Sequence, residues 1–154
     1  MKYILTLLCS ILLFSCSKDE PVITHDNCYI TLVMDNVSIV NGKMYVTKEY
    51  SFEVENVDLK HNGTSERISK VTYTIDNMQK TYSTWTPFKF RYLTSNLELG
   101  SHVLCLFIEI NDEHGAYLFD SAQYVFIVVP TSDDIPDSSE LGTYTTKFKV
   151  TPDK

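Results

Sequence analysis

The strongest constraint on the fold of this chain is the alternation of apolar and polar side chains in short segments between residues 28 and 129. A period of two is typical of a β-strand with one buried face, because successive side chains point to opposite sides of a sheet. The most apolar of these segments is 103–110. The other alternating segments are 28–34, 37–40, 43–47, 50–57, 68–75, 78–82, 88–92 and 117–129.

Turn-forming residues separate these segments. Asn41-Gly42 favours a two-residue type I′ hairpin, since both positions need a positive φ. Asp35-Asn36 and Asp76-Asn77 should each end a strand, and Gly100 should supply a tight turn. No stretch has a helical period of useful length, while Tyr, Phe and β-branched residues are frequent. These features predict an all-β domain, a β-sandwich of about seven to nine strands.

Several motifs resemble those of bacterial immunoglobulin-like domains. Such domains carry a V-x-Y-x-I-D strand, a P-F/Y step and an L-x-x-G-x-H-x-L strand entry. The corresponding stretches here are Val71-Thr72-Tyr73-Thr74-Ile75-Asp76, Thr86-Pro87-Phe88, Leu97-Glu98-Leu99-Gly100-Ser101-His102-Val103-Leu104 and Asn111-Asp112-Glu113-His114-Gly115. The resemblance covers residues 65–129 and implies an immunoglobulin-like β-sandwich in which His102 is structural. It also implies an inward stripe on the strand over 103–110, formed by Leu104, Leu106, Ile108 and Ile110. For function it implies only adhesion, spacing or ligand presentation.

The N-terminus has the organisation of an export signal. Lys2 precedes an apolar run over 3–14, which is shorter than the roughly 20 residues of a membrane-spanning helix. The run ends in Leu13-Phe14-Ser15-Cys16, which resembles the lipobox of bacterial lipoproteins. That resemblance implies cleavage of residues 1–15 as a signal peptide and lipidation of Cys16, so that the lipid attaches the protein to the membrane. Cys9 is a weaker candidate, because it would leave a short apolar run before it and an apolar start to the mature chain.

The residues that follow Cys16 indicate a location. Ser17-Lys18-Asp19-Glu20 resembles the export signal of Bacteroidota-type surface lipoproteins, which implies the outer leaflet of the outer membrane. The periplasmic face of that membrane is the alternative. The chain carries a net charge of −7, which disfavours nucleic acid as a partner.

The strand pattern and the polar stretches between segments also divide the chain into regions. After the signal peptide we expect a tether over 16–26, the immunoglobulin-like sandwich over 27–129, an acidic, proline-containing linker over 130–142, and a C-terminal edge strand with its tail over 143–154. That last strand would pair at an edge of its own sandwich. The alternative is that it is offered to another subunit by β-addition. We expect the pairing within the chain.

The sequence leaves undecided whether two other cysteines are bonded to each other. Cys28 and Cys105 could form a disulfide in an exported protein, provided that their Cα atoms lie within about 7 Å. If Leu104 and Leu106 point inward, Cys105 points to the opposite face. The immunoglobulin-like resemblance expects a partner cysteine in the strand over 50–57, and none is there. Both the bonded and the free forms remain alternatives.

No motif indicates catalysis. His25, His61, His102 and His114 are scattered without metal-ligand spacing, so we expect neither a metal nor a cofactor. The loop tip over 112–114 could offer oxygens to a cation but is better explained as a solvated turn. No motif places a base and an orienting group around a serine, cysteine or threonine, as an activated nucleophile requires. We therefore expect no enzyme activity.

The most suggestive residues are aromatic. Trp85 and Tyr82 belong to a connection between strands, where aromatic faces could stack on sugar rings. The alternative is that Trp85 folds back over the end of the sandwich as a lid. Asp120-Ser121-Ala122 resembles the O-glycosylation site of Bacteroidota-type exported proteins, which would modify Ser121. The Asn62-Gly63-Thr64 sequon is less informative in a bacterial protein.

These inferences together predict a surface lipoprotein of the outer membrane. It would act as a non-enzymatic binding or accessory module, with a glycan or an outer-membrane protein as partner. The alternative is a structural or adhesin-like subunit that assembles through its C-terminal strand.

Overall fold

The computed structural model describes residues 29–60, 67–78, 80–111 and 117–150. Within these ranges the chain forms nine strands, three short 3₁₀ helices and no α-helix. The strands are β1 (Tyr29–Val40), β2 (Lys43–Thr47), β3 (Phe52–Lys60), β4 (Arg67–Ile75), β5 (Thr81–Ser83), β6 (Phe90–Tyr92), β7 (Gly100–Asn111), β8 (Tyr117–Val129) and β9 (Gly142–Lys149). The 3₁₀ helices are η2 (Thr94–Asn96), η3 (Ser132–Asp134) and η4 (Pro136–Ser138).

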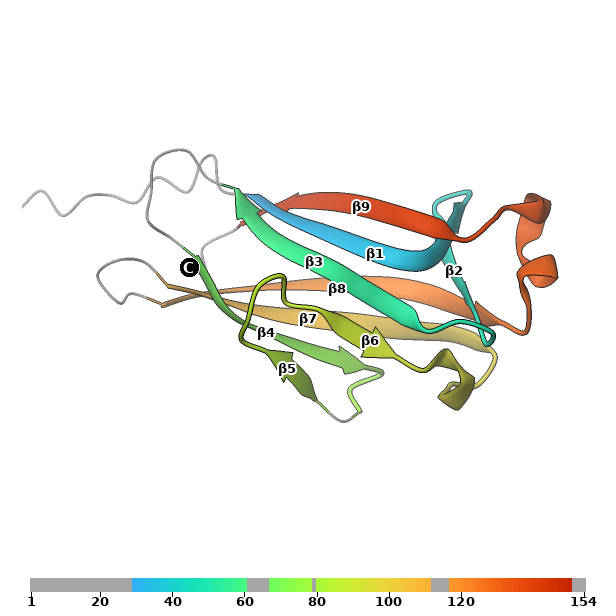
Figure 1. Cartoon of the computed structure of the whole chain (residues 1–154), viewed down its shortest axis with the longest axis horizontal. Helices are drawn as coiled ribbons and strands as arrows, with labels where there is room; N and C mark the ends of the chain where they lie inside the picture. The colour runs from blue at the N-terminus through green and yellow to red at the C-terminus, as the bar shows by residue number, and fades with distance from the viewer. Residues whose placement is uncertain (1–28, 61–66, 79, 112–116, 151–154) are drawn as a thin grey trace, which may run out of the picture.

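The strands form two facing sheets (Figure 1). In sheet A, β9, β1, β3 and β6 pair antiparallel in that order. In sheet B, β5, β4, β7 and β8 pair antiparallel, and β2 joins β8 in parallel. The chain leaves sheet A after β3, builds β4 and β5 in sheet B, and returns with β6 beside β3. Such crossing between two antiparallel sheets gives an immunoglobulin-like β-sandwich, as the sequence predicted.

β1 belongs to both sheets. Residues 29–35 pair with β3, and residues 38–40 pair with β2. Between these parts Asn36 has a φ of 59°, a left-handed conformation that asparagine adopts more readily than most residues. Its Nδ2 donates to the carbonyl of Ser51 at 2.9 Å. The prediction that Asp35-Asn36 ends a strand is therefore wrong, because these residues bend a single strand from one sheet into the other.

The hairpin between β1 and β2 confirms the predicted turn. Val40 pairs with Lys43, which leaves Asn41 and Gly42 as the two loop residues. Their φ values are 50° and 74°, as a type I′ turn requires.

The core fills the space between the sheets. The side chains of the predicted stripe on β7 are fully buried, and Val71, Tyr73 and Ile75 on β4 lie beside them. Aromatic pairs join the two layers: Phe52 of sheet A stacks on Phe126 of sheet B with 5.6 Å between ring centroids. Tyr50, just before β3 begins at Phe52, is 53% exposed.

The C-terminal strand lies within its own sandwich. β9 pairs antiparallel with β1 from Tyr29↔Lys149 to Val37↔Gly142, on the side of β1 opposite β3. Of the two alternatives for this strand, the structure has the pairing within the chain.

The segment before β9 covers the residues of the expected linker. It contains η3 and η4, and Ile135 between them is buried against Val40 and Tyr45. An apolar side chain in this otherwise polar stretch gains stability by leaving water, so the acidic connection is packed against the domain at Ile135.

Several predictions concern residues outside the described ranges. They include the signal peptide, Cys16, the tether, Cys28, three of the four histidines (His25, His61 and His114) and the sequon. Among the described residues, no helix is both long and apolar enough to cross a membrane.

Candidate functional site

The connection between β5 and β6 presents Trp85 to solvent. Its side chain is 83% exposed, so the alternative in which Trp85 forms a lid over the core is wrong. Phe88, three residues later, is buried with 3% of its surface exposed and contributes to the main core instead. The turn between the two residues sends one aromatic ring outward and the other inward.

Hydrogen bonds fasten this turn to both sheets. The backbone N–H of Phe88 donates to the carbonyl of Trp85 at 2.7 Å, across a cis peptide between Thr86 and Pro87. The N–H of Val57 on β3 donates to the carbonyl of Pro87 at 3.0 Å. The hydroxyl of Tyr73 on β4 donates to the carbonyl of Phe88. Burial raises the pKa of Tyr73, so this hydroxyl keeps the proton that it donates.

Tyr82 lies at the same edge of the sandwich. It is in β5, the edge strand of sheet B, and is 68% exposed. Tyr82 lies opposite Thr72 on β4, in register. Thr72 lies opposite Phe107 on β7, and Phe107 lies opposite Ser121 on β8. These four residues, here called the outer row, cross the face of sheet B that points away from the core.

The outer row includes a residue that the sequence reasoning missed. Phe107 is 45% exposed on β7, although its neighbours Leu106 and Ile108 are fully buried. Because side chains alternate along a strand, the implied inward stripe also places Phe107 outward, so the signal was present. Ser121 is exposed within β8, and its N–H bonds the carboxylate of Asp120 at 2.8 Å.

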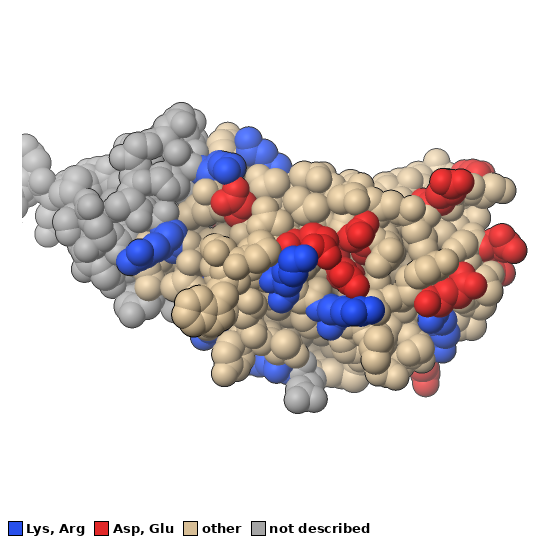
Figure 2. All heavy atoms as spheres, viewed as in Figure 1, with Lys and Arg blue, Asp and Glu red and all other residues tan. Residues whose placement is uncertain are grey.

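The outer face of sheet A has a different character. Arg91 on β6 pairs with Glu53 on β3 at 3.1 Å, and Lys89 pairs with Glu55. The hydrogen bond from Lys89 holds the pKa of Glu55 below its usual value. Figure 2 shows side chains of both charges over β3 and β6. This face is typical of a solvated surface, which leaves the aromatic groups of sheet B as the better candidate for a binding surface.

The immunoglobulin-like motif residues Asp76 and His102 form a clamp at one end of β7. His102 Nδ1 lies 2.5 Å from Asp76 Oδ2, and Nε2 lies 2.9 Å from the carbonyl of Glu98. Asp76 Oδ1 accepts from the N–H of Val103 at 2.8 Å, and the N–H of Asp76 donates back to Val103 at 2.9 Å. His102 is therefore structural, as the resemblance implied.

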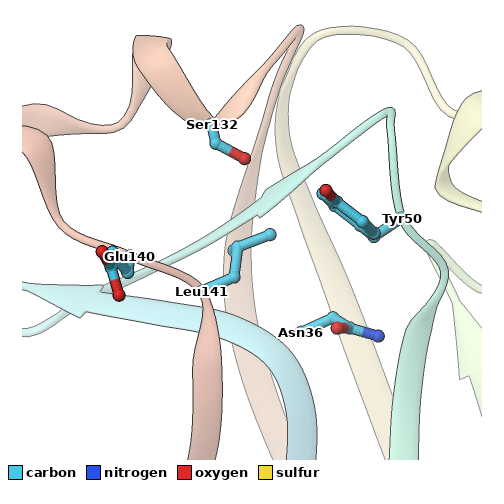
Figure 3. A pocket seen from close by; sticks show the side chains of 5 residues that line it. All are labelled: Asn36, Tyr50, Ser132, Glu140 and Leu141. Carbon is cyan, nitrogen blue, oxygen red and sulfur yellow. The ribbon is translucent and has the colours of Figure 1, made fainter.

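A second candidate site is a hollow of about 300 Å³ beside the bend of β1. Its described lining comes from β1, the loop before β3 and the connection between β8 and β9 (Figure 3): Asn36, Tyr50, Ser132, Glu140 and Leu141. Sequence reasoning did not find this site, because no local pattern joins these residues.

The segment that contributes Ser132 and Glu140 to this hollow is acidic. The segment over 131–140 contains Asp133, Asp134, Asp137 and Glu140 and no lysine or arginine. Figure 2 shows several acidic side chains, with a basic one among them, at the end of the molecule that carries η3 and η4. Ser132 donates from its N–H and from its hydroxyl to Glu49 Oε2, at 3.0 and 3.2 Å.

Other candidate residues do not converge. Cys105 is a free, buried thiol, with Thr74 and Gln123 as its partners in register. Among the described residues, no group of three or more His, Cys, Asp or Glu side chains is placed to hold a metal ion.

Comparisons with known proteins add little beyond these observations. No family model matches the sequence. No curated protein matches it either. Among solved structures, the chain is similar to one described as the fibronectin(III)-like modules of Clostridium thermocellum CbhA. The match has 14% identity and a TM-score of 0.32, and it covers 60% of this chain and 98% of the other.

Proposed function

We propose that this protein is a lipid-anchored, non-enzymatic binding module of the bacterial outer surface, and that it captures glycan chains through Trp85 and Tyr82. The observation that carries the proposal is the exposure of the Trp85 indole on a turn fastened to both sheets. An aromatic side chain on a fixed backbone can stack on a sugar ring without the cost of ordering the loop that carries it.

The anchoring part of the proposal depends on Cys16. The stretch from Cys16 to Tyr29, which includes the tether and ends where β1 begins, can extend about 45 Å. A lipidated Cys16 would therefore hold the sandwich near the membrane without inserting it. The start of β1 lies beside the end of β9, since Tyr29 pairs with Lys149. The tether would enter at this end, which leaves the 41–42 hairpin and the hollow at the far end of β1.

The anchor is tested by metabolic labelling with palmitate and by cell fractionation. Cys16→Ala should abolish labelling and release the chain from the membrane fraction, whereas Cys9→Ala should change neither. Biotinylation of intact cells then separates the outer surface from the periplasmic face. A labelled Cys16→Ala chain would contradict the assignment of the lipidated residue.

The glycan part is tested by affinity electrophoresis of the full-length chain through gels that contain different polysaccharides. Trp85→Ala and Tyr82→Ala should each abolish or clearly reduce the retardation seen with the parent chain. Tyr50→Ala is the matched control, because it removes an exposed aromatic ring at another site. Absence of retardation on every glycan, or equal retardation of Trp85→Ala and parent, would contradict glycan capture.

The alternative function is assembly of a structural or adhesin-like subunit through β9. Its favouring observation is that β9 lies at the edge of sheet A, with β1 on its one described side. Sedimentation of the full-length chain and of a chain lacking residues 143–154 tests it, with thermal melting to check that the shortened chain folds without the strand that pairs with β1. A concentration-dependent oligomer that is lost with the deletion would favour assembly over glycan capture.

A further inference from the structure

We propose that the hollow beside the bend of β1 binds an organic cation, an ammonium or guanidinium group carried on a flexible apolar stem. This inference is independent of glycan capture. It concerns other residues and the other end of the sandwich. Three properties of the described lining carry it: an exposed aromatic ring, polar groups that chiefly accept hydrogen bonds, and an apolar side chain between them.

The aromatic ring belongs to Tyr50. More than half of its surface is exposed, although its own backbone is fixed. The hydroxyl of Thr94, itself buried, bonds the carbonyl of Thr47 at 2.6 Å and the carbonyl of Tyr50. The ring thus stands at the wall of the hollow on an anchored loop (Figure 3). A cation within about 6 Å of such a ring is attracted by the negative charge of its face.

The polar groups are chiefly acceptors. The amide of Asn36 uses one N–H of Nδ2 to donate to Ser51, and its Oδ1 can accept a hydrogen bond. Ser132 gives its hydroxyl proton to Glu49, so its oxygen also acts as an acceptor toward the hollow. Glu140 adds a carboxylate. The five described lining residues include no lysine, arginine or histidine.

A ligand that matches this lining must donate hydrogen bonds and carry positive charge. Ammonium and guanidinium groups donate only. The acidic side chains of the 131–140 segment strengthen the attraction, because this segment carries no lysine or arginine. A metal ion fits less well, since no group of three or more His, Cys, Asp or Glu among the described residues could hold one. The side chain of Leu141 projects between Tyr50 and Glu140 and offers contact to an alkyl stem (Figure 3).

Two sources share this chemistry: lysine or arginine side chains of another protein, and free polyamines. Calorimetric titration of the full-length chain with Nα-acetyl-lysine amide, Nα-acetyl-arginine amide and cadaverine distinguishes them. Tighter binding of the amino-acid amides indicates a protein partner, and tighter binding of cadaverine indicates a free amine. Nα-acetyl-norleucine amide is the neutral control, since it keeps the stem and lacks the charge.

We expect saturable binding of at least one cation with a dissociation constant of about 1 mM or tighter, weakened by added salt. Binding of the norleucine amide equal to that of the lysine amide would overturn the proposal, as would no heat of binding with any cation.

Variants then locate the site. Tyr50→Leu keeps an apolar side chain and removes the ring, and it should weaken binding about three- to fivefold. Glu140→Gln should weaken it at least as much. Asp137→Asn is the matched control: it removes one charge from the same segment outside the described lining, and asparagine tolerates the φ of 59° found there.

If Asp137→Asn weakens binding as much as Glu140→Gln, the cation responds to the general acidic field and the hollow is not its site. Thermal melting of each variant shows that the fold is intact. Should Tyr50→Leu fail to fold, Glu140→Gln decides the question alone, because its side chain is exposed.

Discussion

His102 and Asp76 are joined by a contact of 2.5 Å between imidazole Nδ1 and carboxylate Oδ2, which ties the start of β7 to the turn after β4. The other ring nitrogen of His102 faces the carbonyl of Glu98. Like the ionised carboxylate of Asp76, this carbonyl can accept a hydrogen bond but cannot donate one. Both nitrogens therefore donate, and the ring in this geometry is the charged imidazolium. It also lies against Phe126, with 5.7 Å between ring centroids.

This contact predicts a pH dependence of stability. Burial by itself disfavours the charged imidazole, but the bonds to Asp76 and Glu98 outweigh it and raise the pKa of His102 above 6.5. Burial likewise acts to raise the pKa of Asp76, but the bonds from His102 and Val103 bring it below 3.8. The stabilisation from His102 is complete below pH 6.5 and is lost as pH rises through the raised pKa. That from Asp76 is complete above pH 3.8 and is lost as pH falls through the lowered pKa.

The pair should thus stabilise the fold most between pH 3.8 and pH 6.5. Urea unfolding of the parent chain and of His102→Gln checks this. The difference in their free energies of unfolding should be largest near pH 5 and should shrink as pH rises to about 8.5. The double variant Asp76→Asn/His102→Gln is the control and should lack this dependence. A difference that grows with pH would show that His102 is neutral in the folded protein.

A second prediction compares two neighbours on β7. Leu106 is fully buried in the core, and Phe107 is 45% exposed on the opposite face. Leu106→Ala should lower the free energy of unfolding by about 2–5 kcal/mol, because it leaves a cavity between the sheets. Phe107→Ala should cost about 1 kcal/mol or less, although it removes more atoms. Urea unfolding at a fixed pH measures both, and equal losses would contradict the assigned faces.

The positions of the strands follow from local pattern, which is why the sequence predicted most of them. β7 and β8 are long, regular strands, and the alternation of their side chains marks the buried face without any knowledge of the partner strand. The Asn41-Gly42 turn was equally local, because two adjacent residues with positive φ suffice to reverse the chain.

The candidate sites depend on contacts that no local pattern records. Trp85 and Phe88 are both large aromatic residues in one short connection, and composition cannot tell which of them is buried. The choice depends on hydrogen bonds from Val57 and Tyr73, which lie on other strands. The hollow joins Asn36 to Glu140 only because β1 bends and β9 returns beside it.

A third prediction concerns the thiol of Cys105. The side chain is buried and free, so it should react slowly with iodoacetamide in the folded chain and quickly in concentrated guanidinium. Peptide mapping after alkylation without reduction should recover Cys105 as an unlinked, alkylated residue. Recovery of a peptide that links Cys105 to Cys28 would favour the disulfide alternative.

The last prediction tests whether the segment between β8 and β9 is part of the folded domain. Ile135 has 3% of its surface exposed and packs with Val40 and Tyr45. Just before it, the N–H and the hydroxyl of Thr131 donate to the carboxylate of Asp134, which closes η3. If this packing holds the segment in place, Ile135→Ala should cost about 2 kcal/mol or more of unfolding free energy. Asp133→Asn, an exposed change in the same segment, should stay within about 0.5 kcal/mol. A free linker would instead tolerate both changes equally, and urea unfolding of the two variants beside the parent chain decides between these outcomes.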